Sequence, residues 1–289
     1  MNIAFSKYQA TGNDFILILD LEDGQDFVGG RARAICDRWF GVGGDGVIRV
    51  TRGSAGAPFA MRVTNADGTP AQTSGNGMRC TVAFLAAQGL IGDSQLDTDV
   101  WTPAGVKHVS VVRSGALVTR ATVSMGQPEF TRAAIPMHGA AWETFLDQPF
   151  DIGGTTVRAG AVSMGNPHLV LFVDEDPERY HVAHAGSALE NHELFPERTN
   201  VEFARVREGG ADIDVRVWER GVGETLACGT GACAVAVVAA ETGRSPSKVV
   251  VHYPGGDLLV TRAEDGQVLL GGDVSHVFDG TVDLDALAP

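Results

Sequence analysis

Two segments of the sequence each place a side chain suited to proton transfer at a Gly-rich turn that leads into a helix. One reads SGNGMRCTVAFLAAQG from Ser74, and the other reads CGTGACAVAVVAAETG from Cys228. A helix N-terminus offers unpaired backbone N–H groups and the positive end of the helix dipole, so it binds anions such as carboxylates. The dipole also favours thiolate over thiol, which makes a cysteine there a candidate base or nucleophile. The pattern predicts two turns that grip one carboxylate, with residues 74 and 228 aimed at the neighbouring carbon, which is Cα in an α-amino acid.

The other three cysteines have ordinary helix residues as neighbours. Cys36, Cys80 and Cys233 are therefore interpreted as buried packing residues, the common role of a cysteine in an apolar helix. The four cysteines form no CxxC pair and no array with histidines. The sequence predicts no metal site and a reduced, cytoplasmic protein.

The two segments belong to a longer internal repeat. Ser74 and Cys228 lie 154 residues apart. TGNDFILILD pairs with MGNPHLVLFVD, and MRVTNADG pairs with VRVWERG, both at an offset of 153 residues. Chance similarity between Gly-rich turns is the alternative, but three matches in the same order and at nearly one offset indicate a duplicated domain.

The local patterns predict an α+β fold made of two pseudo-symmetric domains, each a curved β-sheet around a central helix. Short β-branched runs bounded by Gly, Asn or Asp predict strands, for example ILILD, MRVTN, VRVW, LVLFV and KVVVHY. Helices are expected over 32–39, 79–88 and 232–242, the last two closed by Gly. The predicted domains are 1–123 and 124–272. The final strand, at 267–270 or 274–278, is expected to return within 273–289 to the first domain.

Composition limits the classes of partner. Hydrophobic residues make up 44% and charged residues 20% of the 289 residues, as in a folded globular protein, and the net charge is −14. No run of Lys or Arg suggests a nucleic-acid surface. The longest apolar run, 232–240, is too short to span a bilayer. We expect a small-molecule ligand, with no nucleic acid and no membrane as partner.

Motifs along nearly the whole chain resemble the diaminopimelate epimerase family. They are GNDF at 12–15, DRWFGVGGDG at 37–46, NADG at 65–68, SGNGMRC at 74–80, GNPH at 165–168, RTN at 198–200 and WERGVGETLACGTGACA at 218–234. The resemblance implies a homodimeric isomerase with no pyridoxal phosphate or other cofactor. Such an enzyme interconverts LL- and meso-diaminopimelate for lysine and peptidoglycan synthesis by two-base proton transfer, in an active site between the two halves.

The resemblance also implies roles for residues at matching positions. Cys228 is one acid/base residue, Ser74 occupies the position of the other, and His168 and Glu219 tune the pair. The implied substrate-binding residues are Asn13, Asn65, Gly75, Asn76, Asn166, Asn200, Glu219, Arg220, Gly229 and Thr230. Arg220 offers a bidentate fork for a distal carboxylate, and Glu219 could accept an ammonium. Without the surrounding motif, the Glu219–Arg220 pair would be interpreted as a solvated surface pair and His168 as structural.

Two positions depart from the family pattern. Family members commonly carry Gln where this chain has Gly46, and the first catalytic cysteine is replaced by Ser74. A serine hydroxyl is a much weaker acid than a thiol and needs an adjacent base to act as one. Three interpretations follow: Ser74 is native and functional, as in some proline racemase relatives; it is native with a changed reaction, such as elimination or one-faced exchange; or it is an engineered substitution that traps substrate.

Two other functions remain as alternatives. One is a related racemase, epimerase or dehydratase for another amino acid, and the other is a binding-only homologue that has lost one cysteine. Arg220, Asn65 and Asn200 favour a substrate with a second charged end, hence diaminopimelate.

Overall fold

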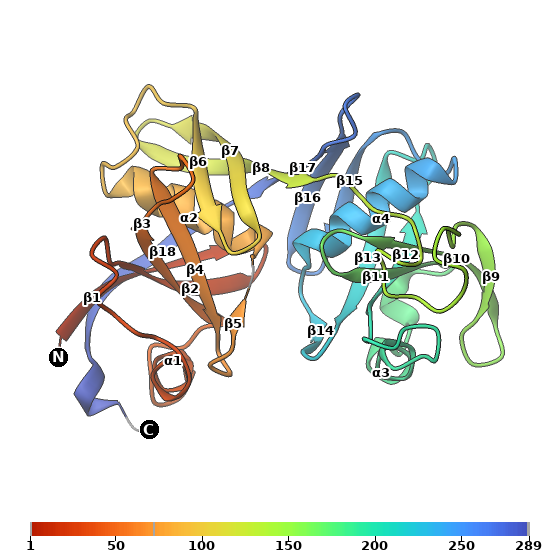
Figure 1. The fold of residues 1–289 in the computed structure, drawn as a ribbon, viewed down its shortest axis with the longest axis horizontal. Helices are drawn as coiled ribbons and strands as arrows, with labels where there is room; N and C mark the ends of the chain where they lie inside the picture. Colours follow the sequence, from red (N-terminus) through yellow and green to blue (C-terminus); the bar gives the residue numbers. More distant parts are fainter. Residues whose placement is uncertain (1, 72, 288–289) are drawn as a thin grey trace. The chain divides into compact units, whose positions relative to one another are not determined.

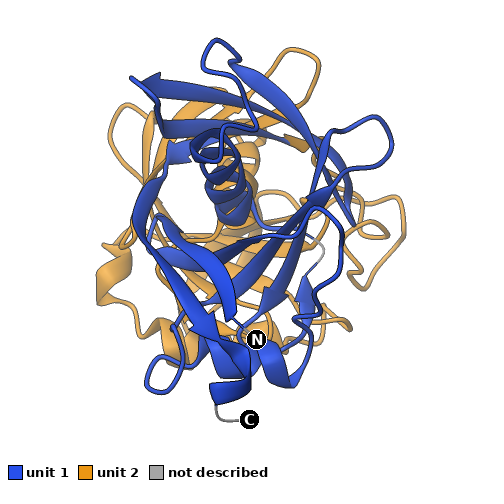
Figure 2. Ribbon diagram, turned by 90° about the vertical axis from the view of Figure 1, so that its left-hand side faces the viewer, with its two compact units in different colours: residues 1–124, 271–289 blue, residues 125–270 orange. Residues whose placement is uncertain are grey.

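The computed structural model describes residues 2–71 and 73–287. The chain divides into two compact units: unit 1 comprises Met1–Ser124 and Gly271–Pro289, and unit 2 comprises Met125–Leu270. Figure 1 traces the chain from the first unit into the second, and Figure 2 colours the units separately.

Unit 1 is a curved sheet around one long helix. Its strands are β1 (Asn2–Ala10), β2 (Asn13–Leu19), β3 (Gly46–Arg52), β4 (Phe59–Asn65), β5 (Pro70–Ala71), β6 (Asp97–Thr102), β7 (Gly105–Ser114), most of β8 (Leu117–Gly126), and β18 (Ser275–Asp283). They pair in the order β18-β1-β2-β3-β4-β6-β7-β8, with β2–β3 and β4–β6 parallel and the other pairs antiparallel. The Val274 amide donates to the Thr119 carbonyl, which ties the segment before β18 to β8.

Unit 2 repeats this arrangement. Its strands are β9 (Gln148–Asp151), β10 (Thr156–Ser163), β11 (Pro167–Phe172), β12 (Asn200–Val206), β13 (Asp212–Glu219), β14 (Gly223–Thr225), β15 (Lys248–Tyr253) and β16 (Gly256–Arg262), and β17 (Val268–Asp273) ends at the unit boundary. The pairing order is β9-β10-β11-β12-β13-β15-β16, with β11–β12 and β13–β15 parallel. Antiparallel and parallel pairs alternate as they do from β1 to β7, and short β5 and β14 each form a hairpin with the preceding strand. This shared topology confirms the predicted α+β fold built by duplication.

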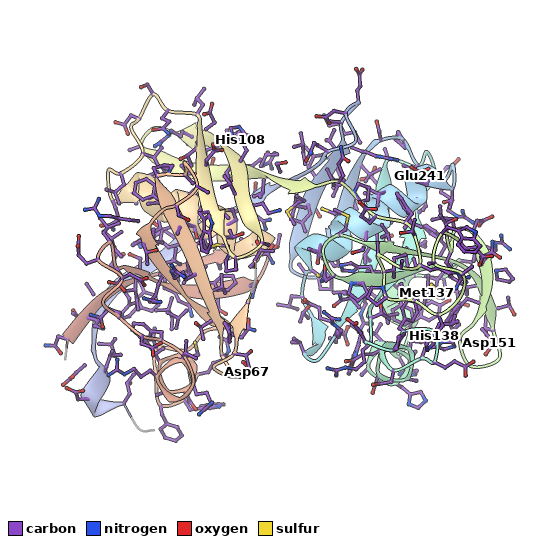
Figure 3. The ribbon with its side chains drawn as sticks, in the orientation of Figure 1. Asp67, His108, Met137, His138, Asp151 and Glu241 are labelled. Carbon is purple, nitrogen blue, oxygen red and sulfur yellow. The ribbon has the colours of Figure 1, made fainter. Side chains whose placement is uncertain are left out.

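Each sheet encloses a helix made of small and apolar residues. In unit 1 this helix is α2 (Gly75–Ala87), and in unit 2 it is α4 (Gly229–Glu241). Nearly every residue of either helix is buried because strands surround it, and Figure 2 shows the unit 1 strands curving around theirs. Gly89 and Gly243 follow the two helices at φ 69° and 71°, the left-handed conformation that closes a helix and favours glycine. Glu241, labelled in Figure 3, marks the end of α4.

The helix boundaries differ from the predicted ones in physically understandable ways. Both central helices begin earlier than expected because Gly at the first turn does not prevent helix formation when a side chain caps it. α1 (Gly30–Cys36) ends three residues before the predicted Trp39, since the Asp37 carboxylate accepts from the amides of Trp39 and Phe40 and turns the chain. α3 (Val182–Glu190), which packs against β13, was not predicted.

Two short 3-10 helices, Pro177–Arg179 and Leu284–Ala286, complete the elements. Over residues 2–71 and 73–287, no helix combines the length and apolar character needed to cross a membrane.

Candidate active site

The expected site residues of each unit gather at one end of its sheet. In unit 1, Asn13 begins β2, Gly46 begins β3 and Asn65 ends β4, and Gly46 pairs with Asn65. In unit 2, Asn166 precedes β11 and Asn200 begins β12. Parallel neighbours begin at the same edge of a sheet, and an antiparallel neighbour ends there, so the pairings β2–β3, β3–β4 and β11–β12 place these residues at one end of each sheet. Hydrogen bonds join Asn13 and Asn166 there to the first turn of the central helix.

Ser74 caps α2 through its side chain. Its backbone is extended (φ −147°, ψ 121°), and its hydroxyl accepts from the Gly77 amide at 3.0 Å. Within the described part of unit 1, this is the one hydrogen bond of the Ser74 hydroxyl, and no carboxylate or imidazole of that unit contacts it. Ser74 therefore sits at a helix N-terminus as expected, but unit 1 supplies no adjacent base of the kind a serine needs for proton abstraction.

Asn76, in the first turn of α2, joins the helix start to the sheet end. Its Nδ2 donates to Asn13 Oδ1 at 3.3 Å, and its Oδ1 accepts from the Arg79 guanidinium at 2.8 Å and from Thr11 Oγ1 at 3.3 Å. The side chain is 4% exposed. Together these hydrogen bonds determine which way the Asn76 side-chain amide is turned, because rotating it would break all three.

A network of charged side chains also contacts Asn13. Asn13 Nδ2 donates to Asp45 Oδ2 at 2.7 Å, and Arg38 bridges Asp45 and Asp14. Lys7 Nζ also lies 2.7 Å from Asp14 Oδ2. Burial acts to raise the pKa of Asp14, but the bonds from Arg38 and Lys7 outweigh it and lower this pKa to about 2.

The departure at Gly46 has a steric reason. A Cβ at this position would lie 2.7 Å from the Thr64 carbonyl oxygen on the paired strand. The Gln common in the family therefore could not enter here without a backbone shift. Asn65, opposite Gly46, is exposed and donates to Thr69 Oγ1 at 3.2 Å.

Cys228 caps α4 in the way that Ser74 caps α2. Its sulfur accepts from the Gly231 amide at 3.4 Å and lies 3.4 Å from Thr230 Oγ1. Burial raises the pKa of the Cys228 thiol well above its ordinary value, and the Glu219 and Glu202 carboxylates raise it further. The Thr230 and Gly231 donors act to lower it. The raised pKa favours the thiol over the thiolate, so a base is needed to remove the Sγ proton.

The Glu219 carboxylate, at the end of β13, lies near this thiol. Burial raises its pKa, while hydrogen bonds from Thr225 and from the Cys228 side chain lower it. A carboxylate with a raised pKa binds a proton more strongly than a free one, so its proton affinity lies closer to that of the thiol beside it.

His168 lies beneath this group with no exposed surface. Its Nδ1 is 2.6 Å from Glu202 Oε1, and its Nε2 is 3.1 Å from Asn166 Oδ1. Asn166 Nδ2 in turn donates to Thr230 Oγ1 at 3.4 Å. The structure thus links His168 to the first turn of α4 through Asn166.

Asn200 braces the turn that carries Arg220. Its Nδ2 donates to the Pro167 carbonyl at 2.8 Å, and its Oδ1 accepts from the Arg220 amide at 2.9 Å. Arg220 donates from its guanidinium to the Glu197 carbonyl at 3.1 Å. Both ends of the Asn200 amide are occupied by backbone, so its direct effect is on the position of Arg220.

The two half-sites differ in their ionisable groups although their backbones correspond. Phe15 pairs with Gly46 as His168 pairs with Asn200, and a Cβ at Gly77 would meet Ile48. At the equivalent Gly231, it would meet Glu202. The buried acid and base of unit 2 are thus replaced by apolar side chains in unit 1.

The remaining cysteines lie away from the helix starts. Cys36, Cys80 and Cys233 are buried, and burial raises the pKa of Cys36 and Cys80 to about 12. They are the packing residues that the sequence predicted.

Sequence reasoning missed three neighbours of the unit 2 site: Thr225, Glu202 and Tyr253. Glu202 could have been found, because it is a charged residue inside the otherwise apolar run NVEF. Thr225 and Tyr253 carry no comparable signal in the sequence, since their positions depend on how β14 and β15 fold back.

A family model described as diaminopimelate epimerase matches residues 5–131 and 160–277. A diaminopimelate epimerase of Moorella thermoacetica is 43% identical over 285 residues, covering 97% of this chain and 99% of the relative. Those of Desulfitobacterium hafniense and Synechocystis are 40% and 39% identical, each over 98% of this chain and 99% and 100% of the relative.

Solved structures share the fold at lower identity. A hydroxyproline epimerase from Agrobacterium vitis superposes with a TM-score of 0.72 at 16% identity, covering 100% of this chain and 93% of that one. A probable proline racemase from Agrobacterium radiobacter gives a TM-score of 0.70 at 14% identity, with 99% and 94% covered.

Proposed function

Because this chain belongs to the diaminopimelate epimerase family, we propose that it interconverts LL- and meso-2,6-diaminopimelate at Cα without a cofactor. The observation that carries the proposal is the start of α4. There, the Cys228 sulfur accepts a backbone N–H bond and contacts Thr230, and the partly buried Glu219 carboxylate lies close enough to raise the pKa of the thiol.

The start of each unit's central helix is suited to binding the proximal carboxylate. Gly75 and Asn76 on α2, and Gly229 and Thr230 on α4, supply first-turn amides, which have no acceptor within their own helix. Glycine at these turns lets the backbone approach the anion closely. Asn13 and Asn166 bind polar groups of the same substrate at the sheet ends.

Proton transfer begins at Cys228. Glu219 accepts the Sγ proton, and the resulting thiolate takes the proton from substrate Cα, leaving a carbanion stabilised through the bound carboxylate. The hydroxyl of Thr230 and the amide of Gly231 stabilise the sulfur anion. His168 acts on this group through Asn166 rather than by contact with sulfur.

The second proton comes from the opposite face of the carbanion, from Ser74. A hydroxyl is better suited to giving a proton to a strongly basic carbanion than to taking one from a weak carbon acid. The cap at Ser74 has no adjacent base within the described part of unit 1. We therefore propose an asymmetric enzyme, in which exchange starts readily from Cys228 and hardly at all from Ser74.

The distal end of the substrate is recognised by Arg220 and Asn65, with Asn200 holding the Arg220 turn. Arginine presents a planar fork that binds a carboxylate through two hydrogen bonds. Glu219, next to Arg220 in the chain, binds an ammonium group of the substrate.

Proton NMR of LL-diaminopimelate with the protein in D₂O tests the proposal. Loss of the α-proton signal together with formation of the meso isomer is expected. Cys228→Ala should abolish both, whereas Cys233→Ala, which removes a buried thiol of the same helix, should retain them. Exchange and inversion at the parent rate in Cys228→Ala would refute the assignment.

Because Ser74 has no adjacent base within the described part of unit 1, two alternative functions remain, and the same experiment distinguishes them. Exchange without inversion would indicate one-faced exchange from Cys228. Saturable line broadening without exchange would indicate a binding-only homologue.

We further propose that the enzyme is a homodimer that acts in the cytoplasm on lysine and peptidoglycan precursors. Strand β18 exposes Val277 and Phe278 on unit 1, at 52% and 43% of their surface, and exposed apolar side chains of this kind are common at subunit contacts. Sedimentation equilibrium would report the mass.

A further inference from the structure

Glu202, paired with His168, is a buried carboxylate that the reaction, as described so far, does not use. Both side chains have no exposed surface, and 2.6 Å separates His168 Nδ1 from Glu202 Oε1. Burying a carboxylate is costly unless it is paired and hydrogen-bonded. Glu202 Oε1 also lies 2.8 Å from the place of a Cβ at Gly231, so this carboxylate adjoins the first turn of the helix that Cys228 caps.

Both ring nitrogens of His168 face acceptor oxygens. Nδ1 faces a carboxylate oxygen of Glu202, and Nε2 faces the carbonyl oxygen of Asn166. In this arrangement each nitrogen donates, and the Glu202 carboxylate fixes the direction of the bond at Nδ1.

From His168 onward, every hydrogen bond donates in the same direction. His168 Nε2–H donates to Asn166 Oδ1, and Asn166 Nδ2–H donates to Thr230 Oγ1. The Thr230 oxygen accepts this hydrogen bond, so its own O–H is free to donate to the Cys228 sulfur, 3.4 Å away. Chains of this kind strengthen their members because each bond polarises the next.

We propose that Glu202 is a positioning residue for Cys228: it fixes the direction of the chain through His168, Asn166 and Thr230 so that a hydroxyl proton points at the sulfur. This deepens the proposed function, since it rests on Cys228 being an acid/base residue. Unit 1 has no such chain, because Phe15 and Ile48 stand at the equivalent positions.

Replacing Glu202 by Gln distinguishes this role from simple charge repulsion. The neutral amide at position 202 no longer favours a His168 ring that donates from both nitrogens. Nδ1 keeps its N–H, and Nε2 then presents a lone pair. Asn166 then turns its amide to donate to that lone pair, and Thr230 donates to Asn166 instead of to sulfur. The thiolate loses a donor, whereas repulsion alone predicts that removing the Glu202 carboxylate would favour the thiolate.

The test is an ultraviolet titration of the thiolate, taking the difference from a Cys228→Ala protein in each background. Four other ionisable groups face the sulfur or its surroundings: Glu219, His168, Tyr253 and Cys233. Tyr253 also absorbs in the ultraviolet when it ionises, and Cys228 acts to raise its pKa, so the tyrosinate band is recorded separately at longer wavelength and subtracted. For E202Q we expect the midpoint to rise by about one pH unit, or about tenfold less thiolate below the midpoint.

Thr230→Val should give a similar shift, because it removes the last donor of the chain. The double variant E202Q/T230V should shift no further than T230V, since both changes break one chain. Asp214→Asn is the matched control: it neutralises another partly buried, ion-paired carboxylate of unit 2 and should leave the midpoint unchanged. Thermal unfolding followed by circular dichroism verifies that each variant is folded.

A midpoint that falls or stays constant in E202Q, or shifts that add in the double variant, would overturn the proposal. The titration needs no substrate, so its outcome is separate from that of the D₂O exchange experiment. Exchange that requires Cys228 with an unshifted E202Q midpoint would remove the positioning role alone. A shifted midpoint without exchange would remove the epimerase and keep the chain.

Discussion

Adding a single methyl group to the first turn of either central helix should reveal how differently the two half-sites are built. A Cβ at Gly231 would lie 2.8 Å from Glu202 Oε1 and 3.1 Å from the Tyr253 hydroxyl. At the equivalent Gly77, it would lie 2.9 Å from Ile48 Cδ1. The first contact is with a hydrogen-bonded carboxylate, and the second is with the end of a flexible apolar side chain.

The two Gly→Ala variants should therefore differ in stability. Overpacking costs about 1–3 kcal/mol, and displacing Glu202 from its bond with His168 adds about 1–3 kcal/mol. The better helix propensity of Ala returns at most about 1 kcal/mol at either position. We expect Gly231→Ala to lose about 2–4 kcal/mol and Gly77→Ala to lose less than about 1 kcal/mol, because the Ile48 methyl can rotate away.

Hydrogen exchange measured by mass spectrometry is the suitable assay, because it reports the opening free energy of peptides in each unit separately. Loss of protection should appear in α4, β12 and β15 for Gly231→Ala. Equal effects of the two substitutions on their own units would refute the reasoning, since they would show that Glu202 moves as freely as Ile48.

Three further outcomes are expected. Ser74→Cys should raise kcat/KM equally in both directions, as equilibrium requires, while α-proton exchange started from residue 74 rises from nearly none; an unchanged exchange pattern would contradict the asymmetric mechanism. Arg220→Ala should raise KM for diaminopimelate by an amount equivalent to about 1.5–3 kcal/mol, measured by steady-state kinetics, and an unaltered KM would show that the distal end is bound elsewhere. Asp14, whose pKa is lowered from 3.8 to about 2, should stabilise unit 1 above pH 3.8 by about 2 kcal/mol. That contribution is lost as pH falls toward 2, so Asp14→Asn should flatten the acid limb of a stability–pH curve; a limb of unchanged slope would count against it.

The strands and the duplication could be predicted from sequence because their signal is local. The run ILIL at 16–19 lies within β2, with Asp20 directly after it, and LVLFV covers most of β11 and the residue after it, because β-branched and other apolar residues suit a pleated strand between Asn and Asp. The ends of the two central helices at Gly89 and Gly243 could also be predicted, because the left-handed backbone that ends a helix favours glycine. By contrast, α3 was missed because its amphipathic pattern over nine residues is short.

Of the candidate site, only the residues that lie in recognisable sequence motifs could be predicted. Cys228 and Ser74 could be placed at helix starts from the Gly-x-Gly turns alone. The partner of His168 could not be named, because Glu202 lies 34 residues away and reaches it through the parallel pairing of β11 and β12. Sequence spacing says nothing of which residues oppose each other across such a pair.

The presence of one thiol at a helix start, where a symmetric design would have two, bears on covalent inhibitors. Cys228 stands alone in this respect among the four cysteines, which all lie within the described residues; the other three are packing residues away from the helix starts. An electrophilic substrate analogue should therefore label each chain once, and with one handedness. The stereoisomer that presents its reactive carbon to Cys228 would inactivate the enzyme covalently. The stereoisomer with the opposite configuration at that carbon would bind reversibly. Against an enzyme with two opposed cysteines, both isomers would react, so the choice of isomer becomes a means of selectivity between the two kinds of enzyme.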